Sequence, residues 1–165
     1  MPFIPSFIKW INTRRINQID FFRKYPAETQ QEVLTKLLTL SRDTVWGKEH
    51  GYSSVSGYEQ FRNNVPLQTY EEFMPYVEKL RAGEKDLLWP GEVKWFAKSS
   101  GTTSAKSKFI PVTRESLEGT HYRGMKDCLV MYTSINPDTR IFLGKGLTLG
   151  GSHRINNFSN NSLYG

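Results

Sequence analysis

The stretch that decides the fold is AKSSGTTSAKSKFIPVT, residues 97–113, which places hydroxyl side chains, one glycine and three lysines between two short apolar segments. VKWFAK (93–98) is rich in residues that favour strands, and KFIPV (108–112) is a short apolar run. We therefore expect a strand on each side of a polar loop. The chemistry of the loop suits an anion, because glycine lets backbone N–H groups turn inward, hydroxyls donate hydrogen bonds and lysine supplies a mobile positive charge.

The candidate phosphate contacts of this loop are its hydroxyl residues, its glycine and its lysines. They are Ser99, Ser100, Gly101, Thr102 and Thr103, with Lys98, Lys106 and Lys108 supplying charge. The loop is not a Walker A motif, because that motif has a second glycine where Lys106 stands and opens onto a helix. The Rossmann pattern G-x-G-x-x-G is also absent. Composition alone is equally compatible with a solvated Ser/Thr turn between strands.

Length and composition set the wider limits. The chain has 165 residues and 38% hydrophobic content, which is enough for one ordinary domain with its own core. Its 22 lysines and arginines exceed its 16 aspartates and glutamates, and the net charge of +6 favours an anionic partner such as a nucleotide, a nucleic acid or a membrane surface. The single cysteine, Cys128, excludes an internal disulfide, and three histidines with one cysteine exclude the usual structural zinc sets. This usage favours a reducing, cytoplasmic setting.

The apolar N-terminal segment does not have the order of a signal peptide, in which positive charge precedes the apolar run. Pro5 and Lys9 interrupt it, and no other stretch approaches the roughly 18 consecutive apolar residues of a spanning helix. Ile4, Phe7 and Ile11 recur at helical spacing and predict a first helix. Such a face can lie on an anionic membrane, but it packs far more often on its own protein core. We therefore expect a soluble protein without a membrane partner.

Residues 1–90 are predicted to be mostly helical. After Pro26, an apolar stripe that runs through several leucines to Val45 predicts a second helix, and Gly51 is a typical helix stop.

Two stretches place a hydroxyl residue three positions before a glutamate, which is the pattern of a capping box. They are SGYE (56–59) and TYEE (69–72), and each predicts the start of a helix. The second of these helices has a clear apolar face and is expected to end near Gly83. That face consists of Phe73, Tyr76, Val77 and Leu80.

Residues 91–165 have the texture of an α/β region, in the order strand, loop, strand, helix, strand. RIFLG (140–144) and LTL (147–149) are the later strand candidates, and a helix is expected over residues 113–134. One side of that helix carries Leu117, His121, Met125, Cys128, Leu129 and Tyr132. His121 and Cys128 are therefore expected to be core residues rather than reactive ones. So few strands cannot form a complete sheet for these helices, and we expect the first part of a larger fold.

His153, in GGSHRINN (150–157), is the histidine with the most polar surroundings. It could touch an acyl substrate, but a surface loop is the more common role for such a segment.

The loop SSGTTSAKSK (99–108) resembles the first nucleotide motif of adenylate-forming enzymes, and more narrowly that of the auxin-responsive acyl acid-amido synthetases, the Gretchen Hagen proteins and their bacterial relatives. Other segments resemble the N-terminal region of that family in the same order. They are WGKEHGY (46–52), VPLQTYEEFMPYVEKLRAGE (65–84), LLWPGEVKWFAKSSGTT (87–103) and GSHRINNFSNNSLYG (151–165). The resemblance covers nearly the whole chain and identifies it as an N-terminal fragment of a bacterial-type member.

The resemblance implies an ATP-dependent ligase that works in two steps. A carboxylic acid attacks the α-phosphate of ATP to form an acyl-adenylate and pyrophosphate, and the amine of an amino acid then forms the amide. It implies that Ser99, Ser100, Gly101, Thr102 and Thr103 line the triphosphate. Lys108 would neutralise the leaving pyrophosphate in the place of the motif's lysine, although Lys106 can also fill that role. ATP and Mg²⁺ are the expected cofactors, and no protein metal site is expected.

The resemblance also implies that residues 1–165 are the N-terminal part of a large adenylation domain, with residues 1–90 mostly helical and 91–165 α/β with a phosphate loop at 98–108. The remaining C-terminal part of the parent chain would be its partner, and the fragment alone is expected to be inactive and cytoplasmic.

Two alternatives stay open. The same first half-reaction can end in an acyl-coenzyme A thioester. A module that binds nucleic acid or other anions could use the basic residues together with Trp95 and Phe96, although aromatic residues in a strand belong to the core more often.

Overall fold

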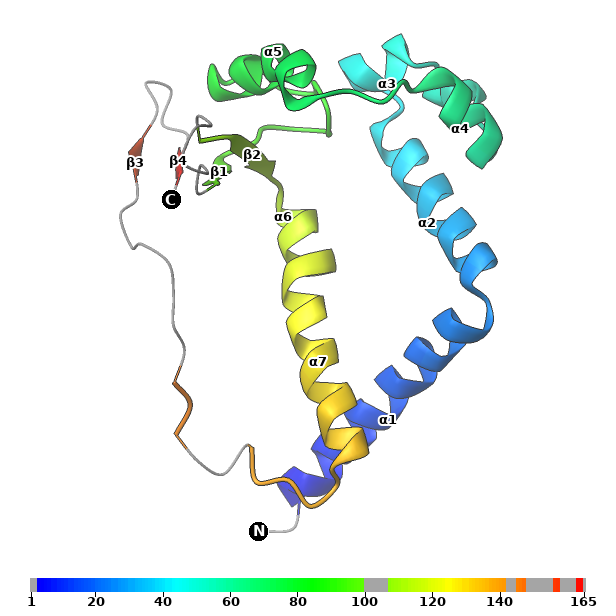
Figure 1. Ribbon diagram of the computed structural model, residues 1–165, viewed down its shortest axis with the longest axis vertical. Helices are drawn as coiled ribbons and strands as arrows, with labels where there is room; N and C mark the ends of the chain where they lie inside the picture. Colours follow the sequence, from blue (N-terminus) through cyan, green and yellow to red (C-terminus); the bar gives the residue numbers. More distant parts are fainter. Residues whose placement is uncertain (1–2, 100–106, 142–144, 148–155, 158–162, 165) are drawn as a thin grey trace. The chain divides into compact units, whose positions relative to one another are not determined.

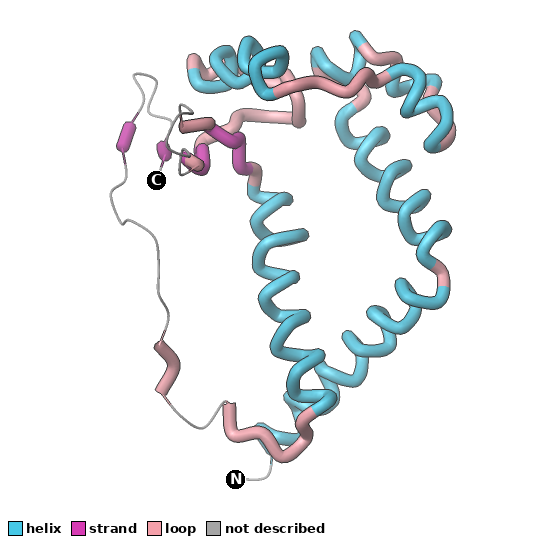
Figure 2. The backbone as a smooth tube through the Cα atoms, viewed as in Figure 1, coloured by secondary structure: helices cyan, strands magenta, loops and turns pink. Residues whose placement is uncertain are grey.

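The computed structural model describes residues 3–99, 107–141, 145–147, 156–157 and 163–164 (Figure 1). Most of the described chain is helical, as the tube in Figure 2 shows. Internal contacts divide it into two compact units. The first joins Met1–Thr29 with Arg114–Gly151, and the second joins Gln30–Thr113 with Ser152–Gly165.

The first unit is a long N-terminal helix packed against a helix that follows the second strand. Its elements are α1 (Phe3–Lys24), α6 (Arg114–Ser116), the π-helical turn η2 (Leu117–His121) and α7 (Tyr122–Ile135). Arg15 of α1 forms two bonds with Asp127 of α7, at 2.6 Å from Nε to Oδ1 and 2.7 Å from Nη2 to Oδ2. Asn12 Nδ2 donates to Thr133 Oγ1 at 2.9 Å. The contact between the two helices is therefore organised by polar pairs.

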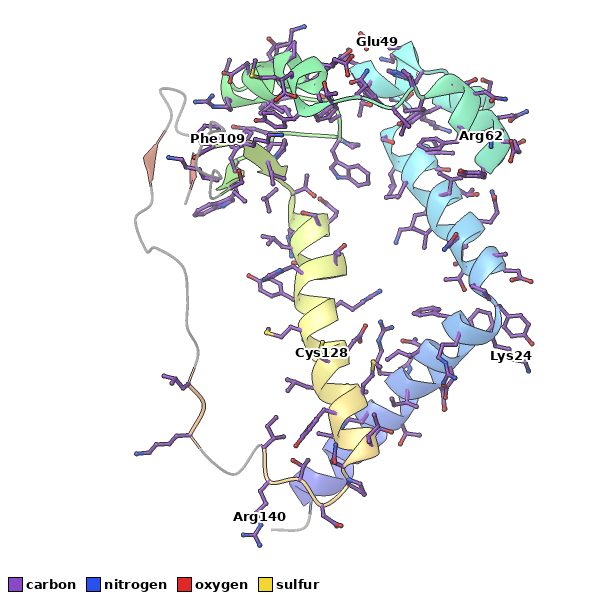
Figure 3. The ribbon with its side chains drawn as sticks, in the orientation of Figure 1. Lys24, Glu49, Arg62, Phe109, Cys128 and Arg140 are labelled. Atoms are coloured by element: carbon purple, nitrogen blue, oxygen red, sulfur yellow. The ribbon has the colours of Figure 1, made fainter. Side chains whose placement is uncertain are left out.

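The predicted core face of the helix over 113–134 is wrong. Cys128 is exposed (Figure 3), and Met125 on the same face is 58% exposed. The side of α7 that contacts α1 carries Asp127 and Thr133, and Val130 between them is 8% exposed. The bonds to α1 set the rotation of α7, and the apolar stripe visible in the sequence does not.

The second unit carries short helices and the strands. Its elements are α2 (Pro26–Ser41), which begins at the boundary between the units, α3 (Val45–Glu49), the 3₁₀ turn η1 (Tyr52–Ser54), α4 (Tyr58–Asn64), α5 (Tyr70–Arg81), β1 (Trp95–Lys98), β2 (Phe109–Val112), β3 (Asn156–Asn157) and β4 (Leu163–Tyr164). The strand order is β2-β1-β4-β3, with β1 antiparallel to β2 and parallel to β4. This arrangement confirms a helical region followed by the first strands of an incomplete α/β fold.

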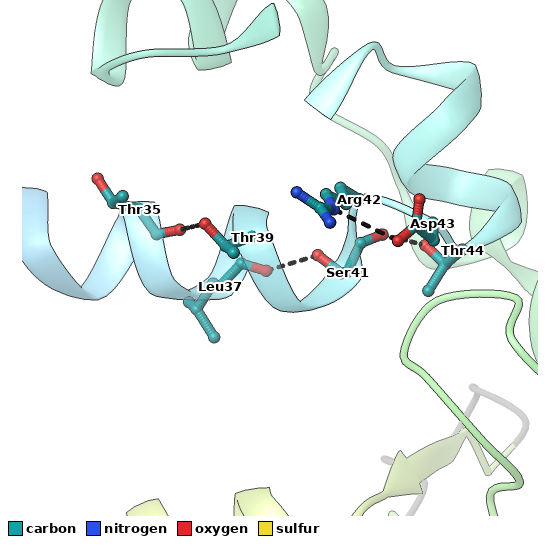
Figure 4. A network of polar contacts seen from close by, with 7 residues as sticks. All are labelled: Thr35, Leu37, Thr39, Ser41, Arg42, Asp43 and Thr44. Atoms are coloured by element: carbon teal, nitrogen blue, oxygen red, sulfur yellow. Dashed lines mark hydrogen bonds and ion pairs between the residues drawn. The ribbon is translucent and has the colours of Figure 1, made fainter. Parts of the chain in front are cut away.

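The second helix ends earlier than its apolar stripe predicts. α2 stops at Ser41, whose hydroxyl donates to the Leu37 carbonyl at 2.7 Å (Figure 4). Thr44 then caps α3 by accepting from Gly47 N–H at 3.0 Å. Val45 N–H bonds to the Asp86 carbonyl at 2.8 Å. Val45 thus begins a separate helix that is fixed by a distant segment.

Only one of the two predicted capping boxes forms. At the start of α5, Thr69 N–H donates to Glu72 Oε2 at 2.7 Å and Glu72 N–H donates to Thr69 Oγ1 at 3.3 Å, which confirms TYEE. SGYE forms no box, because α4 begins after Gly57 and both the N–H and the hydroxyl of Ser56 bond to Gln60.

The core of the second unit lies where α5 covers β1 and β2. Its buried members are Val77, Leu80, Leu87, Val93 and Phe96. Tyr70, Phe73, Leu88 and Phe109 pack against them from the side. The first strand and the start of the second therefore rest on a packed apolar base, and the polar loop 99–108 connects these two strands.

Candidate functional site

The candidate site is the connection between β1 and β2. The antiparallel register pairs Trp95 with Val112 and Lys98 with Phe109, so the loop predicted from sequence is the turn of a hairpin. Ser100, Gly101, Thr102, Thr103 and Lys106 lie outside the described residues. Ser99 and Lys108, at the two ends of the loop, are described.

The structure brings Ser99 and Lys108 together at the neck of the hairpin. Ser99 N–H donates to the Lys108 carbonyl at 2.9 Å, and Lys108 N–H donates to Ser99 Oγ at 2.9 Å. The Ser99 side chain thus replaces a backbone acceptor and closes the neck. A hydroxyl that accepts one bond can still donate its own hydrogen, so Ser99 remains competent to bond to a phosphate oxygen.

The side chain of Lys108 lies against Tyr70. Its Nζ is 4.9 Å from the centroid of the Tyr70 ring, and both residues are partly buried. An ammonium within about 6 Å of a ring face is attracted by the negative face of the ring. The Lys108 ammonium, which is predicted to contact phosphate, is therefore held at the neck of the loop.

Tyr70 was not found by reasoning from sequence. Its hydroxyl accepts from Phe109 N–H at 2.9 Å and lies 3.2 Å from the Phe109 carbonyl, to which it donates. The capping box at Thr69 predicts that Tyr70 opens a helix, and this is correct. No local pattern predicts a partner so far along the chain, because the contact depends on how α5 packs on β2.

Arg81 at the other end of α5 also contacts Phe109. Its guanidinium carbon is 4.3 Å from the centroid of the Phe109 ring, and its Nη1 bonds to Glu78 at 2.7 Å. Phe109 is therefore held by its backbone at one end of α5 and by its ring at the other.

A second polar cluster joins α3 and α5 away from the loop. Trp46 stacks on His50 with ring centroids 3.9 Å apart, and its indole N–H donates to the Tyr52 hydroxyl at 3.0 Å. Tyr76 donates to Glu49, and this bond raises the pKa of the Tyr76 hydroxyl. Burial raises the pKa of Tyr52, against a smaller lowering by the bond from Trp46. These groups bond to one another and fix α3 on α5, so their role is structural.

The first unit has a concavity of about 510 Å³ of its own. Arg14, Arg15 and Arg123 line it together with Phe21 and Phe22. Because Arg15 is bonded to Asp127, the guanidinium groups of Arg14 and Arg123 provide its net positive charge. It lies outside the loop and contains none of the residues predicted to bind phosphate.

The described residues also bear on a metal site, a nucleic-acid surface and a membrane-spanning helix. Among them, no group of three or more histidine, cysteine, aspartate or glutamate side chains is placed to hold a metal ion. Phe96, one of the aromatic residues considered for stacking on nucleic-acid bases, is 2% exposed and belongs to the core, whereas Trp95 is 42% exposed. No helix in the described ranges is both long and apolar enough to cross a membrane.

Comparison with known proteins gives one consistent family. The family model described as the GH3 family N-terminal domain matches residues 15–160. Jasmonoyl-L-amino acid synthetase JAR4 of Nicotiana attenuata is 27% identical over 106 residues, which cover 64% of this chain and 18% of that protein. Indole-3-acetic acid-amido synthetase GH3.5 of Arabidopsis thaliana is 27% identical over 108 residues, which cover 65% of this chain and 18% of that protein.

A solved structure shares the fold. The GH3.15 acyl acid amido synthetase superposes with a TM-score of 0.65 at 24% sequence identity, and the match covers 83% of this chain and 24% of that one. The chain thus spans about a fifth of the length of the curated relatives it matches. Because the family model covers most of its length, this chain belongs to the GH3 family, and its residues 15–160 match the model of the family's N-terminal domain.

Proposed function

We propose that this chain is the N-terminal portion of an ATP-dependent acyl acid-amido synthetase, and that the loop between β1 and β2 grips the triphosphate of ATP. Family membership over residues 15–160 carries the proposal. The names of the relatives support an amide product, since one is a jasmonoyl-L-amino acid synthetase and another an indole-3-acetic acid-amido synthetase. Residues 1–165 would then be part of a large adenylation domain that the remainder of the parent chain completes, and the isolated chain would have no ligase activity.

The proposed reaction needs positioning and charge stabilisation rather than a protein nucleophile. A carboxylate oxygen attacks the α-phosphorus of ATP, forms the acyl-adenylate and expels pyrophosphate. The amine of an amino acid then attacks the acyl carbon, loses a proton and expels AMP. The acids that the relatives are named for suggest a small carboxylic acid and an amino acid as substrates of the parent enzyme.

The candidate phosphate contacts of the loop have proposed roles in the first step. The backbone N–H groups and hydroxyls of the Ser-Ser-Gly-Thr-Thr segment would bond to phosphate oxygens, and Lys108 would neutralise the leaving pyrophosphate, with Lys106 as a second positive charge. The segment consists of Ser99, Ser100, Gly101, Thr102 and Thr103. The neck geometry supports this assignment, because Ser99 and Lys108 are adjacent there, and a hydroxyl that accepts one bond and an ammonium group can both donate to a phosphate oxygen.

The residues at the neck fit a phosphate better than a bare metal ion. Mg²⁺ in nucleotide sites is usually held by one or two carboxylates together with the phosphates themselves. The described neck offers a hydroxyl and an ammonium. We propose that Mg²⁺ arrives with the nucleotide and supplies charge neutralisation on the phosphates. We propose that the parent protein is cytoplasmic, consistent with the single cysteine of this chain.

The test is acid-dependent exchange of labelled pyrophosphate into ATP by the complete translation product that contains this chain. We expect exchange with at least one small carboxylic acid, and a loss of about 100-fold or more in Lys108→Ala, because one donor to a developing charge typically contributes that much. Lys94→Ala is the matched control, since Lys94 is exposed and precedes β1. Exchange that is independent of any acid, or equal loss in both variants, would contradict the proposal.

The same preparation separates the alternatives. Replacing the amino acid with coenzyme A and measuring the product distinguishes an amide from a thioester. A nucleic-acid module would bind single strands with an affinity that falls steeply with salt, whereas nucleotide held in a closed pocket would respond much less.

A further inference from the structure

We infer that Tyr70 is the residue that positions Lys108 for the nucleotide phosphates. Its ring holds the ammonium at the neck of the hairpin, and its hydroxyl fixes the adjoining backbone. The inference rests on the proposed role of the loop as a phosphate site.

The backbone contact follows from the position of β2 in the sheet. The strand order β2-β1-β4-β3 places β2 at an edge, with β1 as its only neighbouring strand among those described. Antiparallel pairs alternate between hydrogen-bonded and non-hydrogen-bonded positions. Because Ser99 and Lys108 bond to each other, the next pair, Lys98 with Phe109, is non-hydrogen-bonded. The Phe109 N–H and carbonyl therefore face away from β1.

At that edge, Tyr70 supplies the hydrogen bonds that a further strand would otherwise make. Its hydroxyl bonds to both backbone groups of Phe109, at 2.9 Å to the nitrogen and 3.2 Å to the oxygen. One side chain thus satisfies the donor and the acceptor of the residue that follows Lys108. This fixes the point at which the Lys108 side chain leaves the strand.

The ring of Tyr70 acts on the ammonium of the same lysine. Lys108 Nζ lies 4.9 Å from the ring centroid. A lysine side chain has several rotatable bonds, and holding it before the ligand arrives removes part of the entropic cost of binding. The ammonium has three N–H donors, and a ring on one side leaves the others open to phosphate oxygens. The ring and a phosphate can therefore share the charge.

The helix that carries Tyr70 is itself anchored. The capping box of Thr69 and Glu72 fixes its first turn, and Arg81 contacts the Phe109 ring about three turns later on the same face. The ring of Tyr70 is thus held on β2 by contacts at both ends of α5.

The experiment is a double-mutant cycle on the complete translation product that contains this chain, with calorimetric titration of Mg-ATP as one readout. The variants are Tyr70→Leu, Tyr70→Phe, Lys108→Ala and the Tyr70→Leu/Lys108→Ala pair. Tyr58→Leu is the matched control, because Tyr58 also opens a helix and has a cation over its ring, Arg62 at 6.0 Å, but is 59% exposed. Thermal unfolding of each variant shows whether it is folded.

We expect Tyr70→Leu to weaken Mg-ATP binding about two- to fivefold, the range of an exposed cation–π contact. In the Lys108→Ala background the same substitution should have no further effect. Tyr70→Phe keeps the ring and should lose less affinity for Mg-ATP than Tyr70→Leu does. Tyr58→Leu should bind Mg-ATP as tightly as the unsubstituted chain. A merely structural role would weaken binding equally in both backgrounds and would overturn the inference.

A second readout does not depend on ATP. The ring over Lys108 should shift the NMR signals of its terminal methylene group upfield in the unsubstituted chain and in Tyr70→Phe, and Tyr70→Leu should abolish that shift. No shift in the unsubstituted chain would overturn the positioning contact by itself. A ring shift without any Mg-ATP binding would instead overturn the proposed phosphate site, and with it the functional role of Tyr70.

Discussion

Different interactions stabilise the interior of each of the two compact units. In the second unit, five apolar residues are buried between α5 and the strands, and the hairpin that carries the candidate site rests on them. In the first unit, the described part of α7 buries one residue, Val130, and its contact with α1 is organised by Arg15–Asp127 and Asn12–Thr133.

The stability of the two units should therefore respond differently to salt and pH. Burial of apolar surface involves no charge, so it is not screened by salt and does not titrate, whereas a partly exposed ion pair is weakened by salt and by protonation of its acid. The proposed phosphate loop is therefore built on the part of the molecule that is least affected by ionic conditions. Substitutions in each unit test this contrast.

The largest effect is expected from Phe96→Ala, which removes a core ring that is 2% exposed. Loss of a buried phenylalanine lowers the free energy of unfolding by about 3–5 kcal/mol. The neighbouring Trp95→Ala is the control on the same strand, since Trp95 is 42% exposed and should cost about 1 kcal/mol. Denaturant unfolding followed by circular dichroism measures both, and similar losses in the two variants would break the comparison.

An intermediate effect is expected from the same glycine substitution made once in each unit. A Cβ at Gly47 would lie 2.1 Å from the Ser41 carbonyl oxygen, so Gly47→Ala should cost about 2–3 kcal/mol through forced backbone shifts. A Cβ at Gly124, within α7, meets nothing within 4 Å. Gly124→Ala should therefore stabilise the helix by about 0.5–1 kcal/mol. The midpoint temperature of thermal unfolding should fall in Gly47→Ala and rise in Gly124→Ala. Destabilisation of equal size in the two variants would contradict the structure.

The smallest effect is expected at the ion pair of the first unit. Asp127→Asn removes the charge that bonds to Arg15 and should cost about 1 kcal/mol, because the pair is bidentate but partly exposed. Asp20→Asn, at the more exposed Arg23–Asp20 pair, should cost less. Thermal unfolding in low and high salt measures the loss of stability in both variants. High salt should reduce the difference between the two losses.

The same pair gives the first unit a dependence on pH. The bond from Arg15 holds the pKa of Asp127 below its ordinary value of 3.8, although burial acts in the opposite direction. A lowered folded-state pKa contributes stability that is complete above 3.8 and is lost as the pH falls through the depressed pKa. Acid unfolding of the unsubstituted chain should therefore be steeper below 3.8 than that of Asp127→Asn. Identical acid transitions would contradict this.

The sequence predicted the features that depend on neighbouring residues. The capping box at Thr69 and Glu72 forms because its two bonds span one helical turn. The strands on both sides of the polar loop form where the β-favouring residues lie. The resemblance of the loop and its flanking segments to the acyl acid-amido synthetases is confirmed by the match to the GH3 family.

Features that depend on distant residues were missed. The break after Ser41 requires the Asp86 carbonyl as a partner for Val45, and the rotation of α7 requires Arg15. Tyr70 belongs to the same class, since its partner Phe109 lies on a strand that only packing brings close. One local prediction was also wrong. SGYE matched the capping pattern, but Ser56 bonds to Gln60 and the helix starts one residue too late for the box.

The most direct test of the phosphate loop is a calorimetric titration of the complete translation product that contains this chain with Mg-ATP, beside Lys108→Ala, at about 50 mM and about 200 mM salt. The account predicts saturable binding that changes little between the two salt concentrations and is weakened about tenfold or more in Lys108→Ala, as expected for the loss of a charge-assisted hydrogen bond. Equal binding by both proteins, a steep loss of affinity with salt, or no saturable binding at all would contradict the claim that this loop holds the triphosphate.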